Sequence, residues 1–196
     1  MAKNLNLMAF DLGASNGRAM VGQFDGDTIK LSELHRFENG IVDMLGIGYW
    51  DTTKLYSEMT KGFAAAKKEG IKLDCFGIDT WGVDYGLLDK NGRLLGNVIS
   101  YRNSVDADME EAFKVVPQRE IFDRTGIASC NYNTLFQLYA RKRINDTALE
   151  NADTLLMLPD LLGYFLTGEK RNEYTIGTTN MMINYKTKDW DRELVS

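Results

Sequence analysis

The short turn between the first two apolar segments limits the possible folds most strongly. Leu5 to Phe10 is apolar and ends at Asp11-Leu12-Gly13, and a second strand-like segment already runs from Arg18 to Phe24. Asp25-Gly26-Asp27 favours a hairpin turn before an alternating third segment, Thr28 to Phe37. The chain is therefore expected to open with a three-stranded antiparallel meander and not with a strand–helix–strand unit.

The middle of the chain predicts one helix between further strands. Positions 38–49 contain three glycines and predict a loop. Apolar residues at helical spacing, with Gly70 at a helix-stop position, predict a helix over about 51–69. Buried strands are expected at Cys75–Asp79 and Val83–Leu88.

From about Val105 the pattern becomes mostly helical. Helices are predicted at Glu110–Val116, Asn133–Ile144 and Asp160–Leu166, with Pro159 at a first helical position. Strands first and helices afterwards, with one crossing helix between, indicate a layered α/β domain with a mixed sheet flanked by helices. We expect a single domain over 1–196.

Composition and charge exclude several classes of function. The chain has 196 residues, of which 44% are hydrophobic and 26% charged, as in a soluble globular protein. Its net charge of -5 argues against a nucleic-acid partner. No apolar run approaches a membrane span and residues 1–10 lack a secretory pattern, so we expect a cytoplasmic protein without a membrane partner. Cys75 and Cys130 are expected to be reduced and buried, and one histidine, His35, excludes a multi-histidine metal site.

The segment from Asp11 to Arg18 is the sharpest candidate for a phosphate site. Glycines let a backbone turn tightly, and successive N–H groups in such a turn form an anion-binding concavity. Ser15 and Asn16 add side-chain donors, Arg18 can meet phosphate charge, and Asp11 can hold Mg²⁺ through water. The alternative is a plain hairpin with a solvated arginine. It is neither a Walker loop nor a dinucleotide loop, because the Gly-Lys-Ser/Thr ending and the following helix are both missing.

A second candidate segment lies between the two expected buried strands. Gly82 would let a ligand meet bare backbone, Trp81 could form an apolar wall against one face of that ligand, and Asp79 and Asp84 could accept hydrogen bonds from its hydroxyls. The alternative places Trp81 in the core and makes Asp79 a turn cap.

Four further positions are weaker candidates. Arg102 fits a ligand contact or a structural ion pair equally well. Asn133 fits a helix N-cap better than a sugar ligand, and His35 fits a structural role. The basic run Arg141-Lys142-Arg143 fits a solvated helix face.

Together these motifs resemble a known family. Asp-Leu-Gly followed by Ser-Asn-Gly-Arg, between two strands of a meander, resembles the first phosphate loop of actin, heat-shock ATPases and sugar kinases. Within that superfamily the chain resembles the FGGY carbohydrate kinases, and most of all those acting on L-rhamnulose. The supporting segments cover almost the whole chain: 11–18, 35–40, 77–84, 101–104, 124–127, 133–138, 158–160, 166–168, 173–175 and 189–191.

The resemblance implies an actin-like ATPase (ribonuclease H-like) domain that transfers phosphate from MgATP to a ketose hydroxyl. It implies ATP contacts at Ala14, Ser15, Asn16, Gly17 and Arg18. Sugar contacts are implied at Gly82 and Trp81, and Mg²⁺ at Asp11. It also implies a catalytic-base aspartate after residue 196 and a second actin-like domain, so no catalytic residue is expected here. A kinase for xylulose or fuculose, or a non-catalytic binding module of the same fold, remains the alternative.

Overall fold

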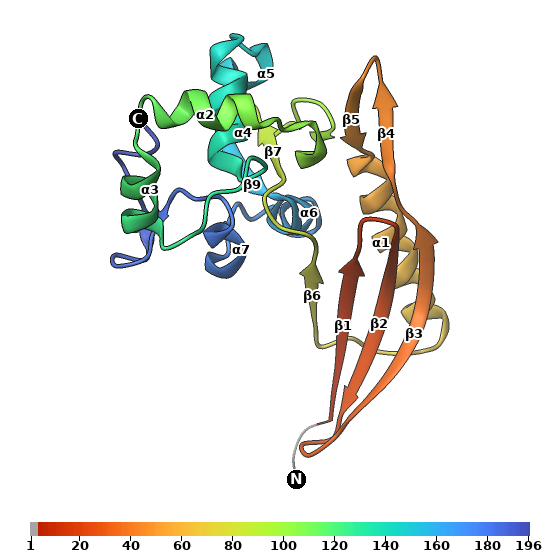
Figure 1. The fold of residues 1–196 in the computed structure, drawn as a ribbon. Coiled ribbons are helices and arrows are strands. Elements are labelled where there is room, and N and C mark those ends of the chain that lie inside the picture. The colour runs from red at the N-terminus through yellow and green to blue at the C-terminus, as the bar shows by residue number, and fades with distance from the viewer. Residues whose placement is uncertain (1–3) are drawn as a thin grey trace.

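A four-stranded mixed sheet forms one half of the molecule in the computed structural model, which describes residues 4–196. Its strand order is β3-β2-β1-β6, with β1 antiparallel to β2 and parallel to β6 (Figure 1). The strands are β1 (Leu5–Leu12), β2 (Asn16–Phe24), β3 (Ile29–Glu38) and β6 (Cys75–Asp79). The expected meander is confirmed. Residues 1–3, which we expected to lead into it without a secretory pattern, lie outside the described residues.

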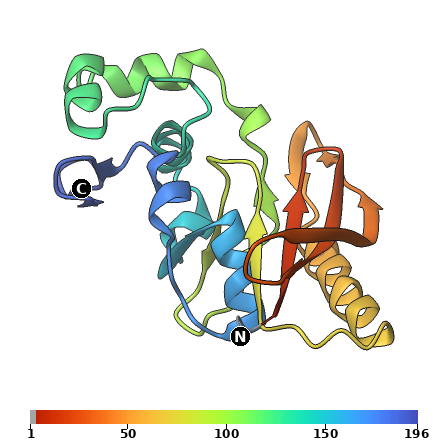
Figure 2. The same ribbon diagram turned by 90° about the horizontal axis from the view of Figure 1, so that it is seen from below.

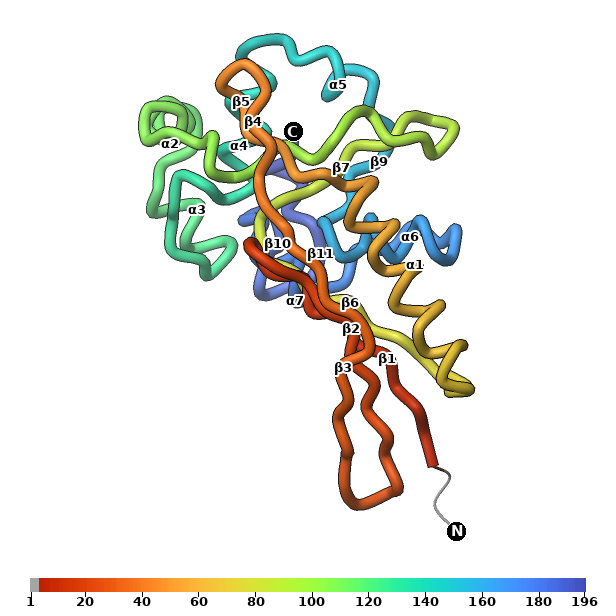
Figure 3. Tube along the Cα trace, turned by 90° about the vertical axis from the view of Figure 1, so that its right-hand side faces the viewer, coloured from red at the N-terminus to blue at the C-terminus, as the bar shows by residue number. Residues whose placement is uncertain are grey.

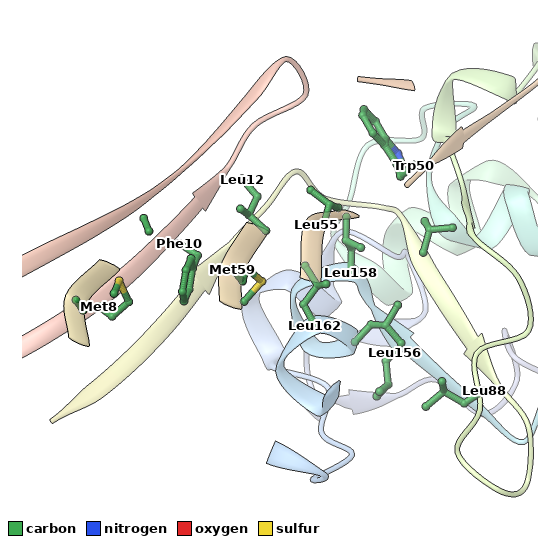
Figure 4. Packing of buried hydrophobic residues seen from close by; sticks show 14 of the residues in the cluster. Met8, Phe10, Leu12, Trp50, Leu55, Met59, Leu88, Leu156, Leu158 and Leu162 are labelled. Carbon is green, nitrogen blue, oxygen red and sulfur yellow. The ribbon is translucent and has the colours of Figure 1, made fainter. Parts of the chain in front are cut away.

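Helix α1 (Thr52–Lys68) covers one face of this sheet. The Asp51 side chain accepts a hydrogen bond from the Lys54 N–H and caps its start, and Gly70 follows its end with a φ of 71°. Because strand side chains alternate, every second residue of β1 faces α1, and Phe10 packs beside Met59 of the helix (Figure 4). The predicted helix is confirmed.

The second half is mainly helical (Figures 1 and 2). Its helices are η1 (Tyr101–Asn103), α2 (Asp106–Phe113), α3 (Gln118–Thr125), α4 (Thr134–Arg143), α5 (Thr147–Glu150), α6 (Leu158–Thr167) and α7 (Tyr174–Thr178). Its strands are the antiparallel pair β7 (Tyr85–Leu88) and β9 (Thr154–Met157), and the short pair β10 (Ile183–Asn184) and β11 (Asp189–Trp190). Leu158 and Leu162 of α6 join Met59 and Leu55 in one buried cluster, so a continuous core links the two halves (Figure 4).

The prediction of a loop over 38–49 is wrong. This segment forms the hairpin of β4 (Ile41–Met44) and β5 (Ile47–Trp50), and β5 also pairs with β8 (Val98–Ile99). Leu45 and Gly46 both have positive φ, 56° and 82°, as a two-residue hairpin turn requires. The glycines of this segment belong to a hairpin, and composition alone does not distinguish them from loop glycines.

The expected burial of β6 and of both cysteines is also wrong. Cys75 is exposed and Cys130 is only partly buried. Within residues 4–196, β6 pairs with β1 alone and forms the sheet edge, so most of its residues are exposed. An apolar run does not distinguish a central strand from an edge strand.

The two ends of the sheet lie at different distances from the helical half. The β2–β3 turn projects away from the helical half, whereas the β1–β2 turn lies at the end nearer to that half (Figures 1 and 3). Across residues 4–196, no helix has the length and apolar character needed to cross a bilayer.

Candidate functional site

The two candidate segments meet at one end of the sheet. Because β1 and β6 are parallel, their carboxyl ends lie at the same edge, and Asp11 is the direct register partner of Asp79. The β1–β2 turn follows the first strand and the segment 80–84 follows the second. Ligands of open α/β sheets bind beyond the carboxyl ends of such strands.

The β1–β2 turn is tight and fixed by Asn39 of the segment that follows β3. The Gly13 N–H donates to the Asn16 carbonyl at 2.9 Å. Asn39 donates through Nδ2 to the Gly13 carbonyl at 2.8 Å and through its N–H to the Ser15 carbonyl at 3.0 Å. Ala14 and Ser15 are exposed, and their N–H groups donate no hydrogen bond among residues 4–196. Two adjacent N–H groups without an acceptor on a fixed turn suit an anion.

Gly17 lies inside β2 and has a packing reason for being glycine. A Cβ at this position would lie 2.3 Å from Cζ of Phe37 on the neighbouring strand. The ring therefore packs directly on bare backbone. Gly17 therefore lies in the strand that follows the turn, where its contact with Phe37 stabilises the strand pair, and it is not part of the turn itself.

The charged side chains beside the turn contact one another. Arg18 donates through Nε to Oδ2 of Asp11 at 2.8 Å, and its Nη2 lies 2.7 Å from the same oxygen. Arg36 of β3 lies opposite Arg18 in the register and donates to Oδ1 of Asn16 at 3.3 Å. Arg36 is a second cation at the turn that the motif itself does not include. The alternation along β3 was the only available signal for it.

The segment after β6 is organised by a fully buried carboxylate, Asp84. The indole N–H groups of Trp50 and Trp81 donate to its Oδ2 at 2.6 and 2.7 Å. The Tyr101 N–H donates to its Oδ1 at 2.9 Å. Burial raises the pKa of Asp84 to about 7, against the opposing effect of these donors. The expectation that Asp84 accepts from sugar hydroxyls is wrong, because no solvent reaches it.

Val83, between Gly82 and Asp84, has an unusual backbone. Its φ is 67°, rare for a β-branched residue, and the Asp84 N–H donates across it to the Gly82 carbonyl at 2.9 Å. The Val83 N–H donates to Oγ1 of Thr179 at 3.0 Å, and its carbonyl accepts from Oγ1 of Thr134 at 2.6 Å. Such strain persists only where the surroundings enforce it, and it concentrates at binding sites.

Gly82 and Trp81 lie on the accessible side of this segment and are only partly buried. Trp81 packs against the fully buried Trp50, with ring centroids 4.0 Å apart and the ring planes tilted by 38°. The core interpretation and the ligand-wall interpretation of Trp81 therefore each apply in part. One side of the ring packs against the core, and part of the side chain remains exposed to solvent. A Cβ on Gly82 would lie 3.0 Å from Cγ2 of Thr179, so this glycine also permits close packing.

The weaker candidates are mainly structural. Asn133 stands at the N-cap position of α4, but its side chain accepts from the Cys130 N–H and donates to the Thr179 carbonyl, so it does not cap the helix. His35 lies 2.6 Å from the partly buried Glu58 of α1, as its structural role predicted.

The arginines among these candidates differ from one another. Arg102 is exposed and lies over the Tyr101 ring, 5.5 Å from its centroid, with no ion pair among residues 4–196. The expected solvated face is wrong for Arg141, which pairs with Asp146 at 3.0 Å and is largely buried.

An open groove of about 460 Å³ runs between β6 and α6 beside these segments. It is lined by residues from Phe76–Asp79 of the strand and by Pro159, Asp160 and Tyr164 of the helix. Burial raises the pKa of Asp160 to about 6.

Residues 6–196 match the N-terminal domain of the FGGY family of carbohydrate kinases. The chain belongs to this family. It is 40% identical over 189 residues to the rhamnulokinases of Oceanobacillus iheyensis and Halalkalibacterium halodurans, covering 96% of this chain and 40% of each relative. It thus spans about two fifths of the length of these relatives. A ligand-bound xylulose kinase from Lactobacillus acidophilus superposes with a TM-score of 0.84 at 16% identity, over 97% of this chain and 39% of that one. The expected actin-like fold is confirmed.

Two carboxylates of the FGGY domain fit the divalent cation that sugar kinases typically use. Asp11 and Asp79 are register partners at the carboxyl end of β1 and β6, and both side chains reach solvent. Mg²⁺ is commonly bound by one or two carboxylates and retains several waters. Within residues 4–196 no group of three or more metal-ligating side chains occurs, so water would complete the coordination.

Proposed function

We propose that this chain forms the phosphate-binding and part of the sugar-binding surface of an ATP-dependent ketose kinase that acts on L-rhamnulose. The observation that carries the proposal is the shared edge of β1 and β6. This edge brings the β1–β2 turn beside a segment with a partly exposed tryptophan and glycine, which supports neighbouring phosphate and sugar surfaces. Membership of the FGGY family and 40% identity to two rhamnulokinases support the substrate.

In the proposed mechanism the residues position reactants and neutralise charge, which is most of what phosphoryl transfer requires. Ala14 and Ser15 offer backbone N–H groups to the phosphates, the side chains of Asn16 and Arg18 add donors, and Gly17 holds the start of β2 in place through its packing against Phe37. Mg²⁺ held by Asp11, with Asp79 beside it, would neutralise charge on the phosphate oxygens.

The sugar would lie against Gly82 and Trp81, which place its hydroxyl toward the turn. A general base must accept the proton of that hydroxyl. Asp84 cannot serve because its oxygens are buried and occupied by donors. In line with the family resemblance, the base is an aspartate after residue 196, and a second actin-like domain completes the adenosine site.

Isothermal titration tests the two binding surfaces separately. The 196-residue chain should bind L-rhamnulose more tightly than D-xylulose or L-fuculose, and should bind MgADP independently of sugar. The whole protein, assayed for ketose-dependent ADP release with the same panel, tests the transfer itself. Preference for another ketose would correct the substrate, and nucleotide binding without any ketose response would favour a non-catalytic module.

A further inference from the structure

The buried carboxylate of Asp84 holds together three elements that are distant in sequence. Trp50 ends β5, Trp81 follows β6, and Tyr101 begins η1. All three donate to this single carboxylate, at 2.6, 2.7 and 2.9 Å respectively. Trp50 is fully buried, and Asp84 itself has no exposed surface.

These three donors are N–H groups, and two of them share one oxygen. The side chain of Gln137 in α4 also interacts with the carboxyl and lowers its pKa. A low local dielectric strengthens a hydrogen bond and makes an unpaired donor costly. Each indole can donate in only one direction, along its ring plane. The shared oxygen therefore fixes the orientation of the Trp81 ring as well as its location, and the stacked Trp50 ring restricts it from behind.

The same carboxylate fixes the backbone that precedes it. The Asp84 N–H closes the three-residue turn onto the Gly82 carbonyl at 2.9 Å, across the strained Val83. Thr134 and Thr179 hold the Val83 peptide groups but do not contact Trp81 through any hydrogen bond. Of the described residues, Asp84 alone joins the Gly82 turn, Trp81 and Tyr101.

We propose that Asp84 is a positioning residue for sugar recognition: through Trp81, Tyr101 and the Gly82 turn it sets the shape of the sugar wall without touching the sugar. This rests on the proposed function. A purely structural carboxylate would change stability alone, whereas a positioning residue changes sugar affinity in a protein that is still folded.

Two variants separate these roles. Asp84→Asn keeps the shape and one acceptor but turns an N–H₂ group toward the other donors. Trp50→Phe keeps an aromatic ring beside Trp81 and removes one donor to Asp84, and because Trp50 is fully buried, any effect on sugar is indirect. Asp191→Asn is the matched control, because Asp191 is also buried but pairs with Arg124 and Asn184 away from the site.

The readouts are sugar affinity by titration and indole N–H exchange by NMR of the ¹⁵N-tryptophan-labelled 196-residue chain, with circular dichroism to verify folding. In Asp84→Asn, the Trp81 indole should exchange faster while Trp190 is unchanged, and the Kd for L-rhamnulose should rise about tenfold. Trp50→Phe should shift the same Kd in the same direction. MgADP affinity should stay constant in both, and Asp191→Asn should leave sugar affinity unchanged.

A double-mutant cycle checks the route of the effect. Asp84→Asn and Trp81→Phe should be strongly non-additive in sugar affinity, because the second removes the group through which the first acts. Asp84→Asn with Trp190→Phe should be additive. Unchanged sugar affinity in folded Asp84→Asn and Trp50→Phe would overturn the positioning role. Failure of the wild type to bind any ketose would overturn the proposed function and this role together, so the two failures are distinguishable.

Discussion

Arg18 donates to Asp11 across the first two strands through both Nε, at 2.8 Å, and Nη2, at 2.7 Å, and both side chains remain nearly half exposed. The two residues assigned to phosphate and to Mg²⁺ thus neutralise each other before either ligand is present. If Mg²⁺ and phosphate bound here, Asp11 would pair with Mg²⁺ and Arg18 with phosphate, in place of their pairing with each other.

Removing Arg18 should weaken nucleotide binding and leave sugar binding intact. Loss of one charged contact costs about 1.5–3 kcal/mol, and the exposure of this pair favours the lower value. Arg18→Ala also leaves Asp11 uncompensated, which adds repulsion toward phosphate. Titration with MgADP measures the change, and Arg119→Ala, an exposed α3 residue, is the control. Equal MgADP affinity in Arg18→Ala and the wild type would remove the turn from the phosphate site.

Gly17→Ala should destabilise the fold by about 1–3 kcal/mol, because the new methyl group meets the Phe37 ring. Gly40→Ala is the matched control, since no atom lies within 4 Å of its Cβ position. Urea unfolding measures both free energies of unfolding. Equal stability of the two variants would show that the Phe37 ring moves aside at little cost. Because any larger residue at Gly17 meets this ring, substitutions there measure packing and not phosphate contact.

Gly82 can be tested for sugar contact separately from packing. Gly82→Ala should lower both stability and sugar affinity, since its Cβ meets Thr179 Cγ2 at 3.0 Å. Thr179→Ser removes that methyl group and keeps the hydroxyl that accepts from Val83. The double variant should recover stability in thermal unfolding but not sugar affinity in titration. Recovery of both would show that Gly82 serves packing alone.

The carboxyl of Asp84 should make stability depend on pH in an unusual direction. Its pKa is raised by burial from 3.8 to about 7, so between these values the folded state keeps a proton that the unfolded chain has lost. Stability contributed by this group is therefore greatest below about pH 4 and falls as pH rises to about 7, by about 4 kcal/mol at most.

Urea unfolding from pH 4.5 to 8 measures that slope as the difference between wild type and Asp84→Asn. Asp191→Asn should retain the wild-type slope over this range, because Asp191 has a lowered pKa. A wild-type curve parallel to that of Asp84→Asn would show that Asp84 stays ionised throughout.

Local patterns predicted the elements whose signals are local. The helical spacing of α1, its stop at Gly70 and the start of α6 at Pro159 could all be predicted, because capping and periodicity involve residues a few positions apart. The meander followed from turn residues and alternation. The hairpin of β4 and β5 was missed because its turn uses Leu45 at positive φ, which no turn-residue preference signals.

The candidate site depended on long-range partners, and there the sequence was less informative. Trp50 and Asp84 are 34 positions apart, and only the folded chain brings them together. Arg36 and Arg18 are partners in the register of β2 and β3, but a bulge between Ala19 and Met20 shifts that register. Alternation along the sequence therefore does not predict this pairing. The β1–β2 turn could be proposed as a phosphate site from the sequence because its residues are contiguous.

The 196-residue chain alone should not transfer phosphate. Catalysis needs the phosphate turn, the sugar and a carboxylate base in one place, and closure between domains to align them. The carboxylates near the site are poor bases: Asp11 is paired with Arg18, and Asp84 has no exposed surface. Asp79 is the exposed exception, and it lies beside Asp11 where the metal is proposed.

Lack of a base typically costs a factor of about 10²–10⁴ in rate. A coupled ADP-release assay with ATP, Mg²⁺ and L-rhamnulose should match the enzyme-free blank, and Asp79→Asn is the informative variant. Sugar-dependent turnover that Asp79→Asn abolishes would place the base within this chain.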